Sequence, residues 1–483
     1  MNAPLDRLAA APAVRAVREA LSGGDARAWI VGGTVRDAIL GRPVGDVDLA
    51  VEGDPAQVAR AVARATRGPA FPLSEAFGAW RAIDAGGDWI CDVSPLQGPT
   101  IEDDLMLRDF SVNAMAVPLE PNGALIDPAG GEGDLERRVL RVLGGPTVDE
   151  SSYGRDPLRP LRLARLATEL GFAPDADAER LTREAAPRVT QASPERVFAE
   201  LRRLVMADRV LDGVDLADRL GLFAAILPEV DALHEVDQSQ YHHLDVYGHT
   251  VDVLRQQIVI ERDPEAVFGE LAPRVQAALG APLADELTRA QALRWAALLH
   301  DVGKPRTRGV LPNGRVTFIG HDSVGEEMVS AICRRLRTSE KLRTFIGAVT
   351  KHHLVLGFMV HERPLSRAAV YRYLRTCSPV EIEVTVLSCA DRMATRGRKA
   401  EPAIAAHLEL ARELMAEALD WREHGPPRPP VRGDELAVEL GIPQGPEIGS
   451  LLARLEEASF TGEATTREEG LALARRLRDN PGQ

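Results

Sequence analysis

The sequence predicts an α+β domain at the N-terminus and a mainly α-helical remainder. Short β-branched runs such as AWIVGG, DVDLAVEG and WICDVSPL alternate with helical segments as far as about residue 145, which is typical of an α+β fold. From Asp156 onward the strand signals nearly vanish, and segments such as LRPLRLARLATELGF repeat apolar residues at helical spacing. We therefore expect a mixed sheet with helices, followed by helices alone.

The chain is too long for one hydrophobic core, and its 483 residues favour about three domains. The Pro-rich run HGPPRPPVRG cannot continue a helix and predicts a linker. A stretch rich in His and Asp extends from SQYHHLDVYGH to CADRMATRG. We expect a head at residues 1–145, a helical neck at 146–230, the His- and Asp-rich domain at 231–423, and a linker with a helical tail at 424–483.

Composition excludes several classes of protein. The net charge of −14 argues against nonspecific coating of nucleic acid, although a local basic groove is compatible with it. The four cysteines have no CxxC spacing, which predicts buried thiols rather than a zinc knuckle or a disulfide framework. No apolar run approaches the roughly 20 residues that span a bilayer, and the N-terminus lacks the pattern of a signal peptide. We expect a cytoplasmic protein with no membrane partner; the oligomeric state is left open.

The segment WIVGGTVRDAILG predicts a strand, a tight turn at Gly32 and Gly33, and a helix that carries Arg36. Glycines at such a turn let backbone N–H groups approach a phosphate, and the N-terminus of the helix adds partial positive charge. Alone, a Gly pair between a strand and a helix also fits an ordinary turn.

Two aspartates follow in GDVDLAVEG. Residues two apart on a strand face the same side, so Asp46 and Asp48 project together. Their carboxylates repel unless a cation lies between them, and hard oxygen ligands suit Mg²⁺. Asp92, in WICDVSPL, could complete a two-metal site that activates a 3′-hydroxyl and neutralises a triphosphate. A solvated strand end is the alternative for the Asp pair.

The segment GGTVRDAILGRPVGDVDLA resembles the signature of the class II tRNA nucleotidyltransferases (CCA-adding enzymes) and the related bacterial poly(A) polymerases, members of the polymerase β superfamily. The resemblance implies a polymerase-β-like nucleotidyltransferase head. It also implies that Asp46 and Asp48 bind catalytic metal and that Gly32, Gly33 and Arg36 hold the triphosphate.

Two further motifs extend the resemblance. LRDFSVNAMAV is similar to the family's RRDFxxNAMA motif near the nucleotide sugar, which implies roles for Arg108, Asp109 and Asn113. Leu107 replaces the usual first Arg. RDPLRPLRLARLATELGF is similar to EDxxRxLRxxRFxxxLGF, the family's protein template for the incoming base.

The template motif implies that Asp156 and Arg159 pair with the base. A carboxylate accepts from the exocyclic amino group that cytosine and adenine carry and uracil lacks. Arg155 stands where the family has Glu. Arg162 and Arg165 would line a basic surface for phosphates; an ordinary solvated helix face is the alternative.

The next segment, SPERVFAELRRL, resembles the family's neck helix. Head and neck together imply a tRNA 3′ end as partner, with CTP and ATP as substrates. An acidic protein can bind tRNA if it recognises mainly its shape and a stacked 3′ end.

A second candidate site lies in the His- and Asp-rich domain. Its candidate metal ligands are His249, His300, Asp301, His321, His352, His353 and Asp391. Imidazoles with carboxylates suit transition metals such as Mn²⁺, Ni²⁺, Fe²⁺ or Zn²⁺.

The contexts ALLHDVGKP and FIGHDSVG resemble the HD superfamily, whose members are mostly metal-dependent phosphohydrolases. The resemblance implies His249, His300, Asp301 and Asp391 as core ligands. His321, with His352 or His353, would hold a second metal, and Lys304 would steady a phosphate. In one branch of bacterial CCA-adding enzymes an HD domain confers phosphatase or 2′,3′-cyclic phosphodiesterase activity. The alternative is a degenerate HD fold without turnover.

The sequence thus predicts a CCA-adding type of enzyme that transfers CMP and AMP to a tRNA 3′ end by two-metal chemistry and releases pyrophosphate. A poly(A) polymerase, or a partial enzyme that adds only CC or only A, would use the same head. From other classes, the alternatives are an HD phosphohydrolase whose head only binds RNA, and a noncatalytic RNA-binding protein.

Overall fold

The computed structural model describes residues 3–23, 27–74, 78–121, 123–238, 244–395 and 400–479. Residues 239–243 of the SQYHHL segment and residues 396–397 of CADRMATRG lie outside the described part. The chain forms two compact units, Met1–Ile226 and Leu227–Gln483, and each is described by itself.

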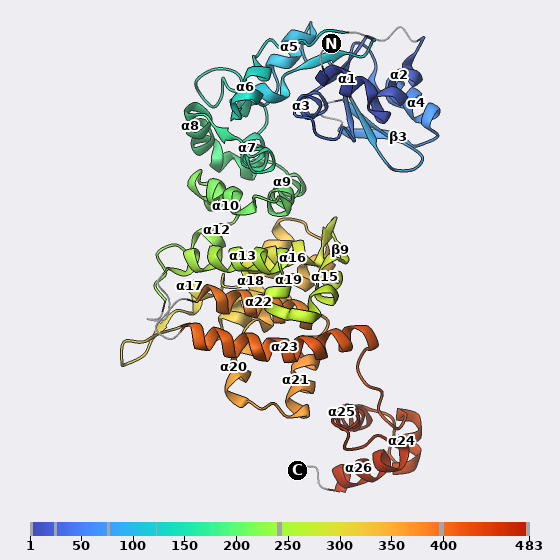
Figure 1. The fold of residues 1–483 in the computed structure, drawn as a ribbon, viewed down its shortest axis with the longest axis vertical. Coiled ribbons are helices and arrows are strands. Elements are labelled where there is room, and N and C mark those ends of the chain that lie inside the picture. The colour runs from blue at the N-terminus through green and yellow to red at the C-terminus, as the bar shows by residue number, and fades with distance from the viewer. Residues whose placement is uncertain are drawn as a thin grey trace. The chain divides into compact units, whose positions relative to one another are not determined.

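The first unit is built on a six-stranded sheet in the order β3-β4-β5-β2-β1-β6 (Figure 1). Its strands are β1 (Ala28–Val31), β2 (Val47–Val51), β3 (Ala70–Ser74), β4 (Ala79–Ile83), β5 (Ile90–Pro95) and β6 (Ala116–Pro118). Strands β2 and β5 are parallel, and the other neighbours are antiparallel. The mixed sheet that the sequence predicts is therefore present.

Helices cover this sheet. They are α1 (Ala3–Ala10), α2 (Pro12–Leu21), α3 (Gly33–Ile39) and α4 (Pro55–Thr66). The Asp54 carboxylate caps α4 by accepting from the Ala56 N–H at 2.9 Å. Helix α4 then packs on β3, β4 and β5. The central strands are buried, with Ile30 and Leu49 at most 1% exposed, which fixes the positions of the residues at their ends.

Beyond the sheet the first unit is helical. Its helices are α5 (Ile101–Met106), α6 (Gly131–Arg137), α7 (Arg159–Leu170), α8 (Ala176–Ala185), α9 (Pro194–Met206), α10 (Val210–Arg219) and α11 (Leu222–Ile226), with the short parallel pair β7 (Val139–Leu140) and β8 (Ala173–Pro174). Helix α7 packs against α9 and α10. It ends at Gly171, whose φ of 70° is left-handed and favours glycine.

The second unit consists mainly of helices. They are α12 (Pro228–Asp231), α13 (Val246–Arg262), α14 (Glu265–Phe268), α15 (Ala272–Gly280), α16 (Arg289–Leu299), α17 (Lys304–Thr307), α18 (His321–Arg335), α19 (Glu340–His352), α20 (Val355–Met359), α21 (Arg367–Cys377), α22 (Glu381–Ala394) and α23 (Ala400–His424). Two hairpins accompany them, β9 (Pro282–Ala284) with β10 (Leu287–Thr288) and β11 (Gly309–Val310) with β12 (Val316–Thr317).

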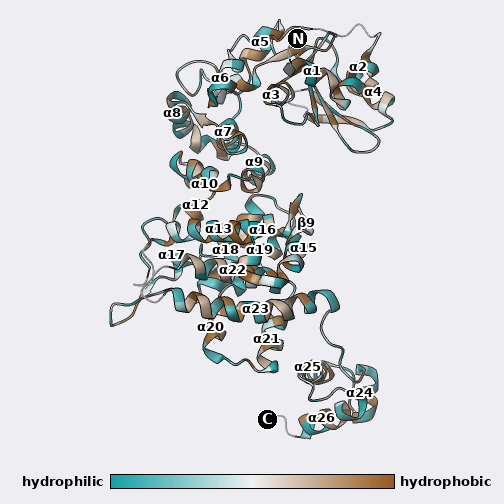
Figure 2. Ribbon diagram, in the orientation of Figure 1, coloured by the Kyte–Doolittle hydropathy of each residue, from teal (hydrophilic) through white to brown (hydrophobic). Residues whose placement is uncertain are grey.

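Helices α13, α16, α19 and α22 pack on one another, and α18 lies on α19. Teal and brown alternate along helices such as α23 (Figure 2), as expected for helices with one buried face. The buried Glu383 of α22 accepts from Arg289 of α16 and from Arg422 of α23, so its charge is paired.

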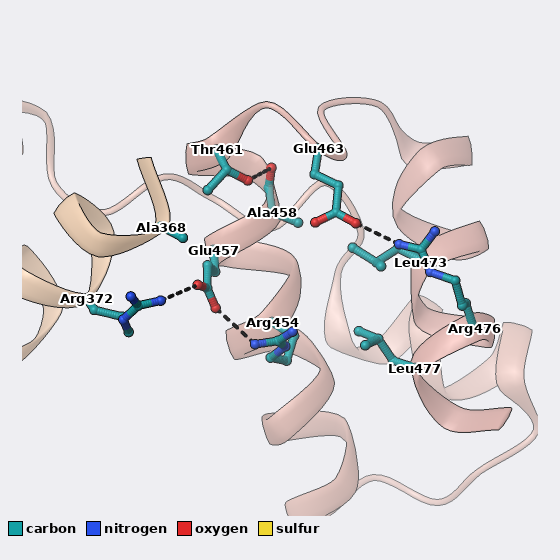
Figure 3. A pocket seen from close by; sticks show the side chains of 10 residues that line it. All are labelled: Ala368, Arg372, Arg454, Glu457, Ala458, Thr461, Glu463, Leu473, Arg476 and Leu477. Atoms are coloured by element: carbon teal, nitrogen blue, oxygen red, sulfur yellow. Dashed lines mark hydrogen bonds and ion pairs between the residues drawn. The ribbon is translucent and has the colours of Figure 1, made fainter. Parts of the chain in front are cut away.

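Three helices end the second unit: α24 (Gly433–Leu440), α25 (Pro446–Thr461) and α26 (Arg467–Asp479). The Pro-rich run lies between α23 and α24. The three helices enclose a core of their own that includes Leu436, Leu455 and Ala474. Figure 3 shows a pocket where α21 faces α25 and α26, with Glu457 and Glu463 paired to neighbouring arginines.

All four cysteines are free and buried, as their spacing predicts. Within the described ranges, every helix is too short or too polar to cross a bilayer.

Strand β2 should be more sensitive to loss of packing than the edge strand β3. Leu49→Ala removes a side chain that is 1% exposed, so we expect a loss of about 2–5 kcal/mol in the opening free energy of β1 and β2. Native-state hydrogen exchange measures that energy. Leu73→Ala, on the edge strand and 43% exposed, is the matched control and should cost below about 0.5 kcal/mol. Equal losses would contradict this account of the core.

Candidate functional site

Three charged residues lie in a row across the sheet of the first unit. The strand register pairs Asp48 of β2 with Asp92 of β5, and Asp92 with Arg81 of β4. Asp46 directly precedes β2, and its carboxylate accepts from the Ile90 N–H at 3.0 Å. The three predicted carboxylates, Asp46, Asp48 and Asp92, are therefore together, and Arg81 is a neighbour that the sequence reasoning missed.

The Gly32-Gly33 turn approaches these carboxylates closely. Gly32 has a φ of 65°, and a Cβ there would lie 3.0 Å from Nη1 of Arg108 and 3.6 Å from Oδ2 of Asp48. A Cβ on Gly33 would lie 3.4 Å from Nη2 of Arg36. Glycine is required at the first position because L-residues rarely adopt that φ. The turn thus brings backbone to the edge of the carboxylate cluster.

Thr34 ties the turn to β2. Its hydroxyl donates to the carbonyl oxygen of Asp46 at 3.2 Å and accepts from the N–H of Asp48 at 2.9 Å. Because the side chain of Thr34 is buried, these bonds are shielded from water. Thr34 therefore holds the Gly32-Gly33 turn at a fixed distance from the backbone of Asp46 and Asp48.

The environment of Asp48 disfavours its negative charge. Burial raises the pKa of Asp48 to about 6, the carboxylate of Asp92 raises it as well, and Arg108 and Arg36 oppose both effects. A divalent cation bridging Asp48 and Asp92 would relieve this cost. The donor set, all carboxylate oxygen, fits a hard cation.

The predicted sugar motif forms a hydrogen-bonded chain. Asn113 accepts from Nη1 of Arg36 at 2.7 Å and donates to Asp109 at 2.9 Å. Burial would raise the pKa of Asp109, but Arg162 and Arg159 lower it to about 2. Arg108 donates to Asp104 at 3.0 and 3.1 Å, so its head group is held beside Gly32.

Helix α9 supplies partners that the motifs did not reveal. Arg162 of α7 donates to Asp109 at 3.1 Å and to Glu200 of α9 at 3.2 Å. Arg165 is buried and donates to Glu200 and, at 2.6 Å, to Glu169. Glu200 thus orients both arginines from the neighbouring helix.

A cavity of about 640 Å³ covers this region. Its lining includes Gly33, Arg36, Asp46, Asp48, Arg81, Asp92, Asp109, Asn113, Arg162, Arg165, Glu200 and Arg203. Carboxylates and guanidinium groups both line this cavity, and several of them are paired with each other. This distribution suits a metal-bound polyphosphate.

The predicted template residues, Asp156 and Arg159, are not among the described residues that line the cavity. Asp156 accepts from the Leu158 N–H at 3.1 Å and from Arg196 of α9 at 2.5 Å. Arg159 donates to the carbonyl oxygens of Leu107 and Ser152 at 3.2 and 3.0 Å. Both side chains are held by these partners, none of which the template motif revealed.

A second cluster lies in the second unit, where three imidazoles share one arrangement. Nδ1 donates to the carbonyl oxygen three residues earlier in His300 (2.9 Å), His321 (2.7 Å) and His353 (2.6 Å). Such a bond fixes the tautomer and leaves Nε2 free to bind a metal. The Nε2 atoms of His321 and His353 are 3.3 Å apart, and two unprotonated nitrogens at this distance repel unless a proton or a cation lies between them.

Asp301 lies at the centre of this cluster. Its carboxylate oxygens are 3.1 Å from Nε2 of His300, 3.4 Å from Nε2 of His321 and 3.8 Å from Nε2 of His249. Burial would raise the pKa of Asp301, but His300 and Lys304 bring it well below the usual value. Asp391, partly exposed and 3.0 Å from Nε2 of His249, completes a set of nitrogen and oxygen donors that fits a transition metal.

The structure distinguishes the two adjacent histidines. His353 converges with Asp301 and His321, and burial with the neighbouring His300 lowers its pKa to about 4. His352 is not among the described residues whose ligand atoms converge; burial lowers its pKa, and its charged neighbours are Glu326, Lys351 and Asp322. His353 is therefore the candidate ligand.

Gly303 allows the cluster to close. A Cβ there would lie 2.2 Å from the carbonyl oxygen of His321 and 2.8 Å from the N–H nitrogen of Gly325. A side chain would therefore push α18, and with it His321, away from Asp301.

Together, the mixed sheet with its carboxylate row defines a metal-dependent nucleotidyltransferase head, and the His/Asp cluster defines an HD domain. Family models agree: "Poly A polymerase head domain" matches residues 28–86 and 88–141, "Probable RNA and SrmB- binding site of polymerase A" matches 171–233, and "HD domain" matches 274–396.

Relatives extend the likeness over nearly the whole chain. An A-adding tRNA nucleotidyltransferase of Deinococcus radiodurans is 36% identical, covering 94% of this chain and 96% of its own. A CC-adding tRNA nucleotidyltransferase of Thermus thermophilus is 35% identical, covering 92% of each chain. The Thermotoga maritima CCA-adding enzyme, solved with tRNA, has the same fold, with 21% identity, a TM-score of 0.58, and coverage of 96% of this chain and 94% of its own.

The chain therefore belongs to the tRNA nucleotidyltransferase and poly(A) polymerase family, as its motifs predicted. Membership implies a divalent metal.

The raised pKa of Asp48 predicts a pH-dependent stability in the metal-free protein. A carboxyl whose folded pKa of about 6 exceeds its unfolded pKa contributes stability at low pH and loses it as the pH rises through 6. Asp48→Asn removes the charge, so in EDTA it should raise the melting temperature above pH 6 and have less effect near pH 4. Calorimetry measures this, with the exposed Glu52→Gln as control. A gain that is independent of pH would contradict the assignment.

Proposed function

We propose that the first unit transfers nucleotides from CTP and ATP to the 3′ end of tRNA and releases pyrophosphate. The row of Asp48 and Asp92 beneath the Gly32-Gly33 turn carries this proposal. In it, the head (1–145) performs the transfer and the neck (146–230) selects the base and guides the RNA. With tRNA as substrate, the reaction would take place in the cytoplasm.

Asp46, Asp48 and Asp92 would hold Mg²⁺ at the reacting phosphate. Bound there, Mg²⁺ would activate the 3′-hydroxyl and neutralise the triphosphate. The Gly32-Gly33 turn and Arg36 would hold the triphosphate, since the turn allows close approach and Arg36 supplies positive charge.

The sugar and the base would meet two further groups. Arg108, Asp109 and Asn113 would contact the sugar. Asp156 would accept from the exocyclic amino group of cytosine or adenine while Arg159 donates to the ring. Arg162 and Arg165, held by Glu200, would line the phosphate side of the cavity.

A restricted version of this activity is the second candidate. The relatives at 36% and 35% identity are named for A addition and for CC addition, each a part of CCA synthesis. Arg155, where the family template has Glu, supports an altered template. The chain would then add only A or only CC.

We further propose that the domain at 231–423 is a metal-dependent phosphohydrolase. His249, His300, Asp301 and Asp391 would hold one transition metal, and His321 with His353 a second; Mn²⁺, Ni²⁺, Fe²⁺ and Zn²⁺ all suit this donor set. Lys304, which lies 2.7 Å from Asp301, would steady the substrate phosphate.

One assay separates these candidates. The protein is incubated with Mg²⁺ and tRNA transcripts that end before CCA, after the first C, and after CC, with CTP, ATP or both. We expect CCA on the first transcript. Addition of A only to the CC end, or of CC alone, would establish the restricted activity. Long A tails on any RNA, or no incorporation, would overturn the proposal.

The two sites should separate by mutation. Asp48→Ala should abolish nucleotide incorporation, because it removes a metal ligand, and spare phosphate release by the Mn²⁺ or Ni²⁺ form. Asp301→Ala should do the reverse. Both activities are measured on folded protein, checked by circular dichroism. Loss of incorporation in Asp301→Ala would show that the two sites do not act separately.

A further inference from the structure

Arg81 holds the third carboxylate of the row with both of its oxygens engaged. Nε of Arg81 donates to Oδ1 of Asp92 and Nη2 donates to Oδ2, each at 2.7 Å. The pair is partly shielded, with the side chains 30% and 25% exposed. Two parallel charge-assisted bonds of this kind are the strongest contact that a guanidinium makes with a carboxylate.

The strand register explains why the pair forms. Arg81 and Asp92 are opposite each other on β4 and β5, and Asp92 is aligned with Asp48 on β2. Arg81 is thus the cationic end of a row whose other two members are acidic. Its guanidinium supplies positive charge on the side of Asp92 away from Asp48.

A divalent cation between Asp48 and Asp92 must share the Asp92 oxygens with this guanidinium. The cation and Arg81 would both contact the carboxylate of Asp92, and their positive charges would repel each other. Arg81 therefore opposes binding of the cation, through this repulsion and by drawing negative charge from the oxygens that the cation would use.

We infer that Arg81 is a built-in counter-ion that competes with divalent metal for Asp92 and so sets the metal affinity of this site. The inference rests on the proposed function, in which Asp48 and Asp92 hold the metal. Arg81 offsets the charge of Asp92 in the metal-free row, and a bound metal would take over that role. Arg81 is a positioning residue, since it acts through Asp92.

The test is a Mn²⁺ titration followed by electron paramagnetic resonance, which counts free Mn²⁺ and needs no turnover. Every protein is the full chain carrying Asp301→Ala, so that the HD cluster does not contribute. Arg81→Met should lower the dissociation constant about tenfold, the size of one charge-assisted hydrogen bond. Arg81→Lys keeps the charge and loses the two-point contact. Its dissociation constant for Mn²⁺ should lie between those of the parent and Arg81→Met.

Two controls accompany the titration. Arg27→Met breaks an exposed ion pair of the same unit, with Glu52 at 3.1 Å, and should leave the affinity unchanged. Asp48→Asn should abolish the site and so identifies the signal. Mn²⁺ should also raise the melting temperature of Arg81→Met by more than that of the parent. Because this rise is measured against the same variant without metal, it remains informative if Arg81→Met is less stable than the parent.

The outcomes separate the inference from the proposed function. An affinity that is unchanged or weaker in folded Arg81→Met and Arg81→Lys overturns the inference, even if the parent extends tRNA. Tighter binding in both variants supports it, even if the parent fails to extend tRNA, in which case only the proposed function falls. Absence of a Mn²⁺ site that depends on Asp48 overturns the inference as well.

Discussion

Negative charge gathered at one place in the sheet is the constraint around which the first unit is arranged. Asp48 and Asp92 are neighbours because β2 and β5 are parallel and in register, and burial raises the pKa of Asp48 to about 6. Three neighbouring guanidinium groups partly offset this negative charge. Arg108 and Arg36 oppose the rise, and Arg81 engages Asp92. Such an arrangement costs stability without a cation and is typical of a functional site.

The HD cluster of the second unit is built mainly from imidazole nitrogens, whereas the cluster of the first unit is built from carboxylates. The Nδ1 atoms of His300, His321 and His353 are committed to backbone carbonyls, so the Nε2 atoms gather around Asp301. His300 and Asp301 share the connection between α16 and α17, while His249, His321 and Asp391 come from α13, α18 and α22. Close contacts such as that of Gly303 with α18 hold these elements at the required spacing. The two units thus carry two centres with different donor chemistry, and we expect them to prefer different metals.

Local patterns predicted much of this arrangement. Alternation along a strand placed Asp46 and Asp48 together, and the strand-like run around Asp92 identified the third carboxylate. Arg81 was missed because its place depends on the register of β4 against β5, which no local pattern encodes. Glu200 and Arg196 were missed because the packing of α9 on α7 alone brings them to Arg162 of α7 and to Asp156 before it. The choice between His352 and His353 depended on where α19 ends, a boundary that sequence periodicity does not fix.

The central claim is that both clusters are metal centres, and anomalous X-ray diffraction from crystals soaked in Mn²⁺ tests it most directly. The account predicts density peaks at two places, one between Asp48 and Asp92 and one among the Nε2 atoms around Asp301. Peaks confined to exposed acidic side chains, with neither cluster occupied, would contradict it.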